Sequence, residues 1–190
     1  KPGESGLLAL DWHNGNRTVL VDQRLTGSLA GMTLQTRPEE VYRALIEATA
    51  FGARVIMERF LEYGMTVERI VNCGGISGKN ALLMQIYADV MGRPLEISKS
   101  AQTCALGAAM AGAVVAGKAA GGHASFTEAA GAMVHTDDKV YRPVEENRKT
   151  YDRLFRLYRK MHDSFGVRGY QEGLFEVMKE LLAIRDEARA

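Results

Sequence analysis

The chain has 190 residues, of which 46% are hydrophobic and 25% are charged, with a formal net charge of +1. This length suffices for one domain that buries roughly 70% of the surface of its unfolded chain. A net charge so close to zero argues against nucleic acid or an anionic membrane as a partner. The longest apolar stretch, residues 105–117, is shorter than the roughly 18 residues of a membrane span.

The first residues, KPGESGLLALDW, have neither the apolar core nor the cleavage site of a signal peptide. They reach an apolar segment abruptly, which leads us to expect a piece of a longer protein. Cys73 and Cys104 stand 31 residues apart and form no CxxC pair, so the pattern favours neither a metal site nor a redox pair. We expect both cysteines to be buried as small hydrophobic residues. Without an export signal, the reducing cytoplasm is the expected location.

Two strand-like segments open the chain. They are GLLALDW (residues 6–12) and RTVLVDQ (residues 17–23), separated by HNGN, in which Asn and Gly are typical of a tight turn. The segment TRPE then predicts a capping box, with Thr36 and Glu39 each bonding the other's backbone amide. Apolar residues at helical spacing follow and predict a long helix that ends at Gly64.

A strand, a helix, a second strand and a second helix come next. The short strands are RIVNC (residues 69–73) and RPLEIS (residues 93–98), and the helices span about residues 80–92 and 104–118. This order implies parallel strands covered by helices. Because the second helix is rich in Ala and Gly, its plain structural interpretation is close packing against the sheet.

The carboxy-terminal part of the chain is predicted to be helical. Residues 119–131 contain a short helix candidate, and Pro143 begins a longer helix. The apolar stripe of that helix consists of Tyr151, Leu154, Tyr158, Met161 and Phe165. A last amphipathic helix carries Leu174, Val177, Met178, Leu181 and Leu182. We therefore divide the chain into residues 1–166 and 167–190 and expect the last helix to dock on the first part; contact with a partner subunit in a homo-oligomer is the alternative.

The segment VNCGGISGKN, residues 71–80, joins a buried strand to a helix. Glycines in this position let backbone amides approach a phosphate, and the helix N-terminus adds positive potential. The P-loop pattern G-x-x-x-x-G-K-[ST] fails, because Cys73 replaces the first Gly and Asn80 the hydroxyl residue. The pattern G-x-G-x-x-G fails too, since Gly74 and Gly75 are adjacent. The local pattern alone leaves both a strand-to-helix turn and a nucleotide site open.

The other candidate sites lack the residue patterns of a catalytic or metal-binding site. In DWHNGNR an Asp lies two residues from a His, but no nucleophile motif is near, and we favour a loop capped by Asp11. The four histidines have no metal-site spacing. Asp11, Asp22 and Asp89 are isolated, so no acidic glycine loop supplies both a base and an environment for Mg²⁺ in phosphoryl transfer.

Several segments together resemble the nucleotide-binding lobe of the FGGY family of carbohydrate kinases, chiefly VNCGGISGKNALLMQIYADVMGRPLEI and TCALGAAMAGAVVAG. The matching pieces are the Gly74–Gly75 loop, the QxxAD segment at residues 85–89, the strand at 95–97 and the ALGAA helix at 105–109. The resemblance covers roughly residues 6–165. Within the family, LLALDWHNGNR together with GGISGKN is most similar to the L-ribulokinase branch.

This resemblance implies an α/β fold of the actin-like ATPase (ribonuclease H-like) type, with a partly parallel sheet flanked by helices and further carboxy-terminal helices. It implies ATP and Mg²⁺ as cofactors and L-ribulose as the sugar, phosphorylated in L-arabinose breakdown. The ATP contacts carried over are Gly74, Gly75, Ser77 and Asn80. Glycine backbone can approach a ligand closely, and the Ser and Asn side chains offer hydrogen bonds. Lys79 could face phosphate or solvent, and Gly107 could allow close helix approach beside the nucleotide.

The family's amino-terminal lobe, with its sugar pocket and catalytic aspartate, has no counterpart in this chain. We therefore expect no catalytic residue here and no activity of the chain alone. Two other functions remain open, namely a kinase for another sugar such as xylulose or glycerol, and a non-catalytic actin-like module for ATP binding or protein interaction.

Overall fold

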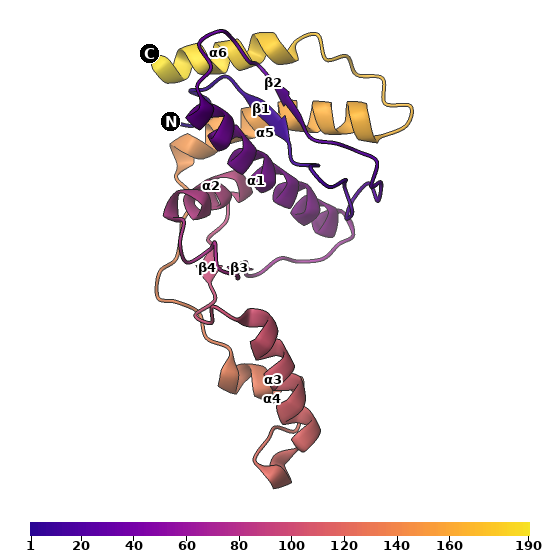
Figure 1. Cartoon of the computed structure of the whole chain (residues 1–190), viewed down its shortest axis with the longest axis vertical. Helices are drawn as coiled ribbons and strands as arrows, with labels where there is room; N and C mark the ends of the chain where they lie inside the picture. Colours follow the sequence, from indigo (N-terminus) through magenta and orange to yellow (C-terminus); the bar gives the residue numbers. More distant parts are fainter. The chain divides into compact units, whose positions relative to one another are not determined.

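The structure, a computed structural model, describes all residues from 1 to 190 (Figure 1). Its elements, in chain order, are β1 (Leu8–Leu10), β2 (Ser28–Ala30), α1 (Pro38–Glu62), β3 (Val71–Asn72), α2 (Ala81–Met91), β4 (Glu96–Ile97), α3 (Thr103–Ala116), the 3₁₀ turn η1 (Lys118–Ala120), α4 (Phe126–Met133), α5 (Glu145–Gly166) and α6 (Val177–Arg189). The chain forms two compact units. Unit 1 comprises Lys1–Glu68, Ile86–Arg93 and Pro143–Ala190, and unit 2 comprises Arg69–Gln85 and Pro94–Arg142.

Helix α1 lies at the centre of unit 1, against β1 and α5 (Figure 1). Small residues on its inner face, such as Ala48 and Ala50, are fully buried and let its neighbours approach, while Phe51 packs edge-on against Tyr151 of α5 at 6.1 Å between ring centroids. The helix ends as predicted, because Gly64 takes a left-handed φ of 75° that costs little only for glycine.

The start of α1 differs from the prediction by one residue. The capping box is closed by Glu40, whose carboxylate accepts a hydrogen bond of 2.8 Å from the backbone amide of Arg37. The predicted cap, Thr36, instead accepts from the amide of Thr33 at 2.8 Å and closes a separate turn. The prediction of Thr36 and Glu39 was wrong because the side chain of Thr36 is already bonded within the turn that precedes the helix.

The amino-terminal sheet consists of β1 and β2, which pair antiparallel from Leu8–Ala30 to Leu10–Ser28. All of β1 is buried, so the first strand-like segment was predicted correctly. The second segment, residues 17–23, is not a strand. The side-chain oxygen of Asn16 accepts the amides of Val19 and Leu20 at 3.2 and 3.0 Å, which holds this segment as a loop.

The long carboxy-terminal helix α5 buries four of the five predicted stripe residues, Tyr151, Leu154, Tyr158 and Met161. Phe165 is 56% exposed, so its predicted burial was wrong. Apolar spacing indicates which face of a helix turns inward, but not how far the neighbouring elements extend along it.

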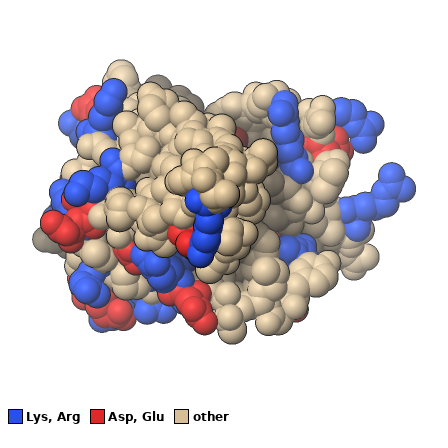
Figure 2. Space-filling view, turned by 90° about the horizontal axis from the view of Figure 1, so that it is seen from below, with Lys and Arg blue, Asp and Glu red and all other residues tan.

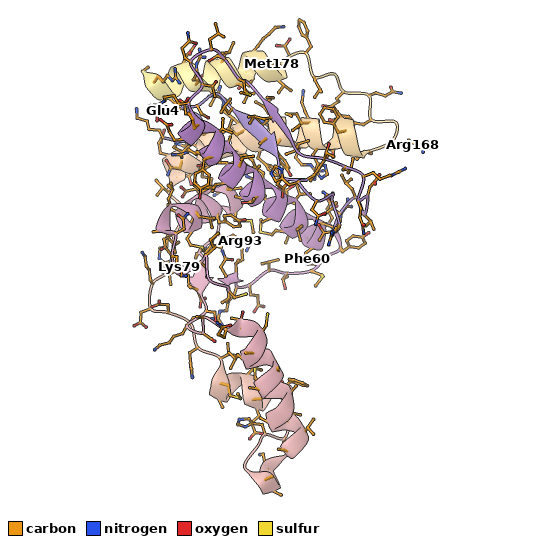
Figure 3. All side chains as sticks on the ribbon, in the orientation of Figure 1. Glu4, Phe60, Lys79, Arg93, Arg168 and Met178 are labelled. Carbon is orange, nitrogen blue, oxygen red and sulfur yellow. The ribbon has the colours of Figure 1, made fainter.

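Helix α6 packs on α5 through Val177, Leu181 and Ile184, all buried. The last helix therefore docks on this chain. Met178 and Leu182, predicted on the same stripe, are 62% and 42% exposed; Met178 is labelled in Figure 3.

A buried carboxylate joins α2 to α5 within unit 1. Asp89 is 2% exposed, and its two oxygens accept from the backbone amide of Val144 and the side-chain amide of Asn147, both at 2.8 Å. Val144 is the N-cap residue of α5, where amides lack partners inside the helix and the helix dipole favours negative charge. Asp89 therefore has a structural role.

In unit 2, β3 and β4 pair in parallel, as the strand and helix order predicted. Helix α3 packs on α4, and none of its residues is buried, so close packing of α3 against the sheet is not found. These two helices carry few charges, as the view from their end shows (Figure 2). Cys73 and Cys104 are both exposed, contrary to the expected burial, because the loop and the helix that carry them are not covered. No helix of the chain is long and apolar enough to cross a membrane.

Candidate nucleotide-binding loop

The loop between β3 and α2 lies in unit 2 and holds all four predicted ATP contacts. Gly74 has a φ of 90°, in the left-handed region that side chains rarely adopt. The chain turns at this glycine from the strand into a series of turns that ends at Lys79, two residues before α2 begins. The left-handed backbone conformation at residue 74 therefore requires a glycine, whether or not a ligand binds.

The backbone of this loop is open to a ligand. A Cβ atom placed on Gly74, Gly75 or Gly78 would meet no atom within 4 Å. All three glycines are exposed, and so is Lys79, the one charged residue between Val71 and Asn80 (labelled in Figure 3). An uncovered backbone before a helix N-terminus is suited to phosphates or to a nucleoside.

The two polar side chains predicted as contacts also hold the loop together. Ser77 is 4% exposed, and its hydroxyl donates to the carbonyl oxygen of Gly74 at 2.7 Å. The side-chain oxygen of Asn80 accepts from the amide of Leu83 at 3.0 Å and so caps α2. Gly107, predicted beside the nucleotide, lies exposed on α3 with open space around it.

The loop carries no acidic side chain, and the chain has no group of three or more His, Cys, Asp or Glu residues that could hold a metal ion. The arrangement can therefore bind and orient a nucleotide through backbone amides, but it brings no general base to it.

Sequence reasoning missed a polar cluster in unit 1. The side chain of Asp11 does not cap its own loop; it accepts a hydrogen bond of 2.8 Å from the hydroxyl of Tyr158 on α5. Trp12 packs edge-on against His162, with 5.2 Å between ring centroids. The partners are about 150 positions apart, so no local pattern could have joined them, although the DWHNGNR segment had been singled out.

The residues of this chain match a known family model, described as the C-terminal domain of the FGGY family of carbohydrate kinases, over residues 1–116. The chain belongs to this family.

Curated relatives cover the whole of this FGGY chain. It is 53% identical over 190 residues to the ribulokinase of Geobacillus thermodenitrificans and 52% identical over 190 residues to that of Anoxybacillus flavithermus. The ribulokinase of Staphylococcus aureus is 44% identical over 186 residues, 98% of the chain. The chain spans about a third of the length of these relatives, 33% of the first two and 32% of the third.

Solved structures of several sugar kinases share the fold of this chain. A ligand-bound xylulose kinase and a gluconate kinase, both from Lactobacillus acidophilus, superpose with TM-scores of 0.75 and 0.74 at 24% identity, over 88% of this chain and 33% of theirs. Glycerol kinase of Plasmodium falciparum with ADP gives a TM-score of 0.62 at 20% identity, over 86% of this chain and 31% of its own. The predicted fold, an α/β lobe of the actin-like ATPase type, is confirmed.

Proposed function

We propose that this chain is the carboxy-terminal part of a cytoplasmic kinase that transfers the γ-phosphoryl group of ATP to L-ribulose and yields L-ribulose 5-phosphate. The observation that carries the proposal is the 53% identity over the whole chain to a protein named ribulokinase. In this proposal residues 1–166 form the ATP-binding lobe, and residues 167–190 add the helix that packs on it.

The proposed nucleotide contacts are Gly74, Gly75, Ser77 and Asn80. The glycines provide uncovered backbone, because no atom lies within 4 Å of the space that a side chain would fill. Ser77 supports the loop through its bond to Gly74, and Asn80 fixes the start of α2 with its oxygen, which leaves its amide nitrogen to donate to the nucleotide. The chain would therefore contribute to the reaction by holding ATP in position.

Mg²⁺ bound to ATP would neutralise charge on the transferred phosphoryl group. The residues of this loop do not form a site for it, since they include no carboxylate. We propose that the metal is held by the phosphates and by groups outside this chain, and that the proton acceptor for the sugar hydroxyl also lies outside it.

The nucleotide site is tested by calorimetric titration of Mg-ATP into the chain and into its Gly75→Asp variant. Gly75 has open surroundings and no left-handed φ, so an aspartate fits there, but its charge repels phosphates. We expect weak binding to the chain and at least roughly tenfold weaker binding to the variant, equivalent to 1.4 kcal/mol.

The matched control is Gly173→Asp, which adds the same charge at another open, exposed glycine outside the loop. Equal binding by both variants and the unsubstituted chain would place the nucleotide elsewhere. Loss of binding in both would indicate a non-specific effect of net charge.

The identity of the sugar substrate is tested on the intact protein that contains this chain. Initial rates of ADP formation are compared for L-ribulose, xylulose and glycerol, and we expect the highest kcat/KM with L-ribulose. A preference for another sugar would replace the substrate in this proposal. No kinase activity, combined with ATP binding by the chain, would favour the non-catalytic module.

A further inference from the structure

Ser77 is the only buried residue of the loop at residues 71–80. It is 4% exposed, and its hydroxyl donates a hydrogen bond of 2.7 Å to the carbonyl oxygen of Gly74, three residues earlier. All other residues from Cys73 to Lys79 are exposed. A buried hydroxyl that bonds a backbone carbonyl of its own loop fixes the orientation of one peptide group, here the peptide between Gly74 and Gly75.

The peptide between Gly74 and Gly75 has few other constraints. Neither residue has a side chain, and glycine adopts more backbone conformations than any other residue. A Cβ atom added to either glycine would meet no atom within 4 Å, so no neighbouring element packs against this part of the loop. The hydrogen bond from Ser77 is therefore the contact that holds this peptide in one orientation.

This bond also determines where the amide of Gly75 points. All peptide bonds of the chain are trans, and in a planar trans peptide the C=O and N–H groups point in opposite directions. Because the carbonyl of Gly74 points at the buried hydroxyl, the amide of Gly75 points away from it, toward the uncovered side of the loop. That amide donates no hydrogen bond within the chain.

The amides that follow are also free to bind a ligand. None of the amides from Ile76 to Gly78 donates a hydrogen bond within the chain. The turn that contains them is closed by the carbonyl oxygen of Ile76, which accepts from the amides of Lys79 and Asn80 at 3.1 and 3.0 Å. Successive unpaired amides in a turn form a concave site for an anion, and the amide of Gly75 begins this run of donors.

A phosphate group matches these donors, because backbone amides only donate hydrogen bonds and ionised phosphate oxygens accept them. No carboxylate lies between Val71 and Asn80 to repel it. On the basis of the proposed function, we infer that Ser77 is a positioning residue: its bond to Gly74 turns the amide of Gly75 toward a phosphate group of ATP. Among the residues proposed to bind the nucleotide, Ser77 therefore acts through the Gly74–Gly75 peptide.

Ser77→Ala tests this role in the intact protein that contains the chain, because it removes the hydroxyl and leaves every backbone group in place. We expect the KM for Mg-ATP to rise about tenfold and kcat to stay within about twofold, since the amide contacts the phosphate in the ground state and the transition state alike. A purely structural role would give the reverse, because a smaller folded fraction lowers the apparent kcat and leaves KM unchanged.

The matched control is Ser125→Ala, which removes another hydroxyl of unit 2. That hydroxyl accepts from the amide of Glu128 at 3.2 Å and caps α4, outside the loop. An unchanged KM for Mg-ATP in a folded Ser77→Ala protein, or an equal rise in Ser125→Ala, would overturn the role of Ser77. A wrong proposed function gives a different result, namely an unsubstituted protein whose rate has no saturable dependence on Mg-ATP.

The amide of Gly75 is observed directly in ¹H–¹⁵N correlation spectra of the ¹⁵N-labelled chain, titrated separately with Mg-ATP and with adenosine, which has no phosphate. We expect a saturable shift of the Gly75 signal with Mg-ATP and none with adenosine. This measurement needs no variant, so it stands even if Ser77→Ala does not fold. Shifts with Mg-ATP that leave the Gly75 signal in place, or an equal shift of that signal with adenosine, would overturn the contact with phosphate. A chain in which Mg-ATP shifts no signal would contradict the proposed nucleotide site itself, and the role of Ser77 with it.

Discussion

Glu47 and His162 are both buried ionisable residues of unit 1, but their environments differ. Glu47 accepts from Arg43 Nε and from the hydroxyl of Tyr151, both at 2.9 Å, so its carboxylate is well partnered. His162 has one carboxylate neighbour, Asp163, and an unpartnered Nε2. Burial raises the pKa of Glu47 and lowers the pKa of His162, in each case by disfavouring the charged form.

The lowered pKa of His162 predicts a loss of stability in mild acid. The unfolded chain binds a proton at this residue near pH 6.5, while the folded chain resists it, so stability is lost as the pH falls below 6.5. For one proton the slope is at most about 1.4 kcal/mol per pH unit. The measurement is the free energy of unfolding by urea between pH 7.5 and pH 5.5.

The raised pKa of Glu47 acts on stability with the opposite sign, so the decisive quantity is a difference between variants. His162→Gln should remove part of the acid loss. His135→Gln, at an exposed histidine, should retain it. Identical slopes for the unsubstituted chain and His162→Gln would show that His162 is not the group that titrates.

At the scale of elements, the same residue type has opposite roles in two helices. Glycine in a helix interior normally costs stability, about 1 kcal/mol relative to alanine. Gly107 in α3 follows this rule, since nothing lies within 4 Å of an added Cβ. Gly52 in α1 does not, because a Cβ there would lie 2.4 Å from a carboxylate oxygen of Asp11.

We therefore predict opposite effects of two glycine-to-alanine substitutions. Gly107→Ala should stabilise the chain by about 0.5–1 kcal/mol through helix propensity. Gly52→Ala should destabilise it by about 1–3 kcal/mol, because the added methyl group overpacks the space held by Asp11. Urea denaturation followed by circular dichroism measures both, and a Gly52→Ala chain as stable as the unsubstituted one would rule out the close approach.

At the scale of the whole molecule, the two units differ in how their helices are buried. Helices α1 and α5 of unit 1 each carry a buried face, whereas α3 of unit 2 has no buried residue. Free energies of local opening follow such differences, since elements with few buried contacts open without global unfolding.

Hydrogen exchange should therefore separate the units. Backbone amides of α3 should exchange at least about tenfold faster than those of α1 and α5, which corresponds to about 1.4 kcal/mol less free energy of opening. Mass spectrometry of peptides from the three helices measures this. Equal protection of α3 and α5 at low protein concentration would contradict the prediction, and protection that rises with concentration would point to self-association over α3.

The local sequence determined most helices and their ends. Apolar spacing located α1, α2 and α5, and Gly64 and Gly92 mark helix ends, each with a left-handed φ that is cheap only for glycine. The order of short strands and helices also gave the parallel pairing of β3 with β4. The loop at Gly74 was found because a glycine cluster after a strand is itself a local signal.

The wrong predictions concern segments whose structure depends on neighbours that are distant in the sequence. A local sequence pattern does not indicate whether such a neighbour is present. The segment at residues 17–23 has the residue types of a strand, but no neighbouring strand pairs with it. Phe165 and the two cysteines have apolar character, but no element covers them. Whether a side chain is buried depends on which elements pack next to it. Residue type alone therefore predicted more buried side chains than the structure has.

The sequence by itself thus determined most helices, the family motif and the glycine-rich loop after β3, because hydrophobic period, glycine conformation and loop composition act over a few residues. Only the tertiary structure brought Asp11 to Tyr158 and Trp12 to His162, since these pairs join the loop after β1 to α5. A cavity that they line forms only when that loop, α1 and α5 pack together. Contacts between residues so distant in the chain are decided by how the elements pack.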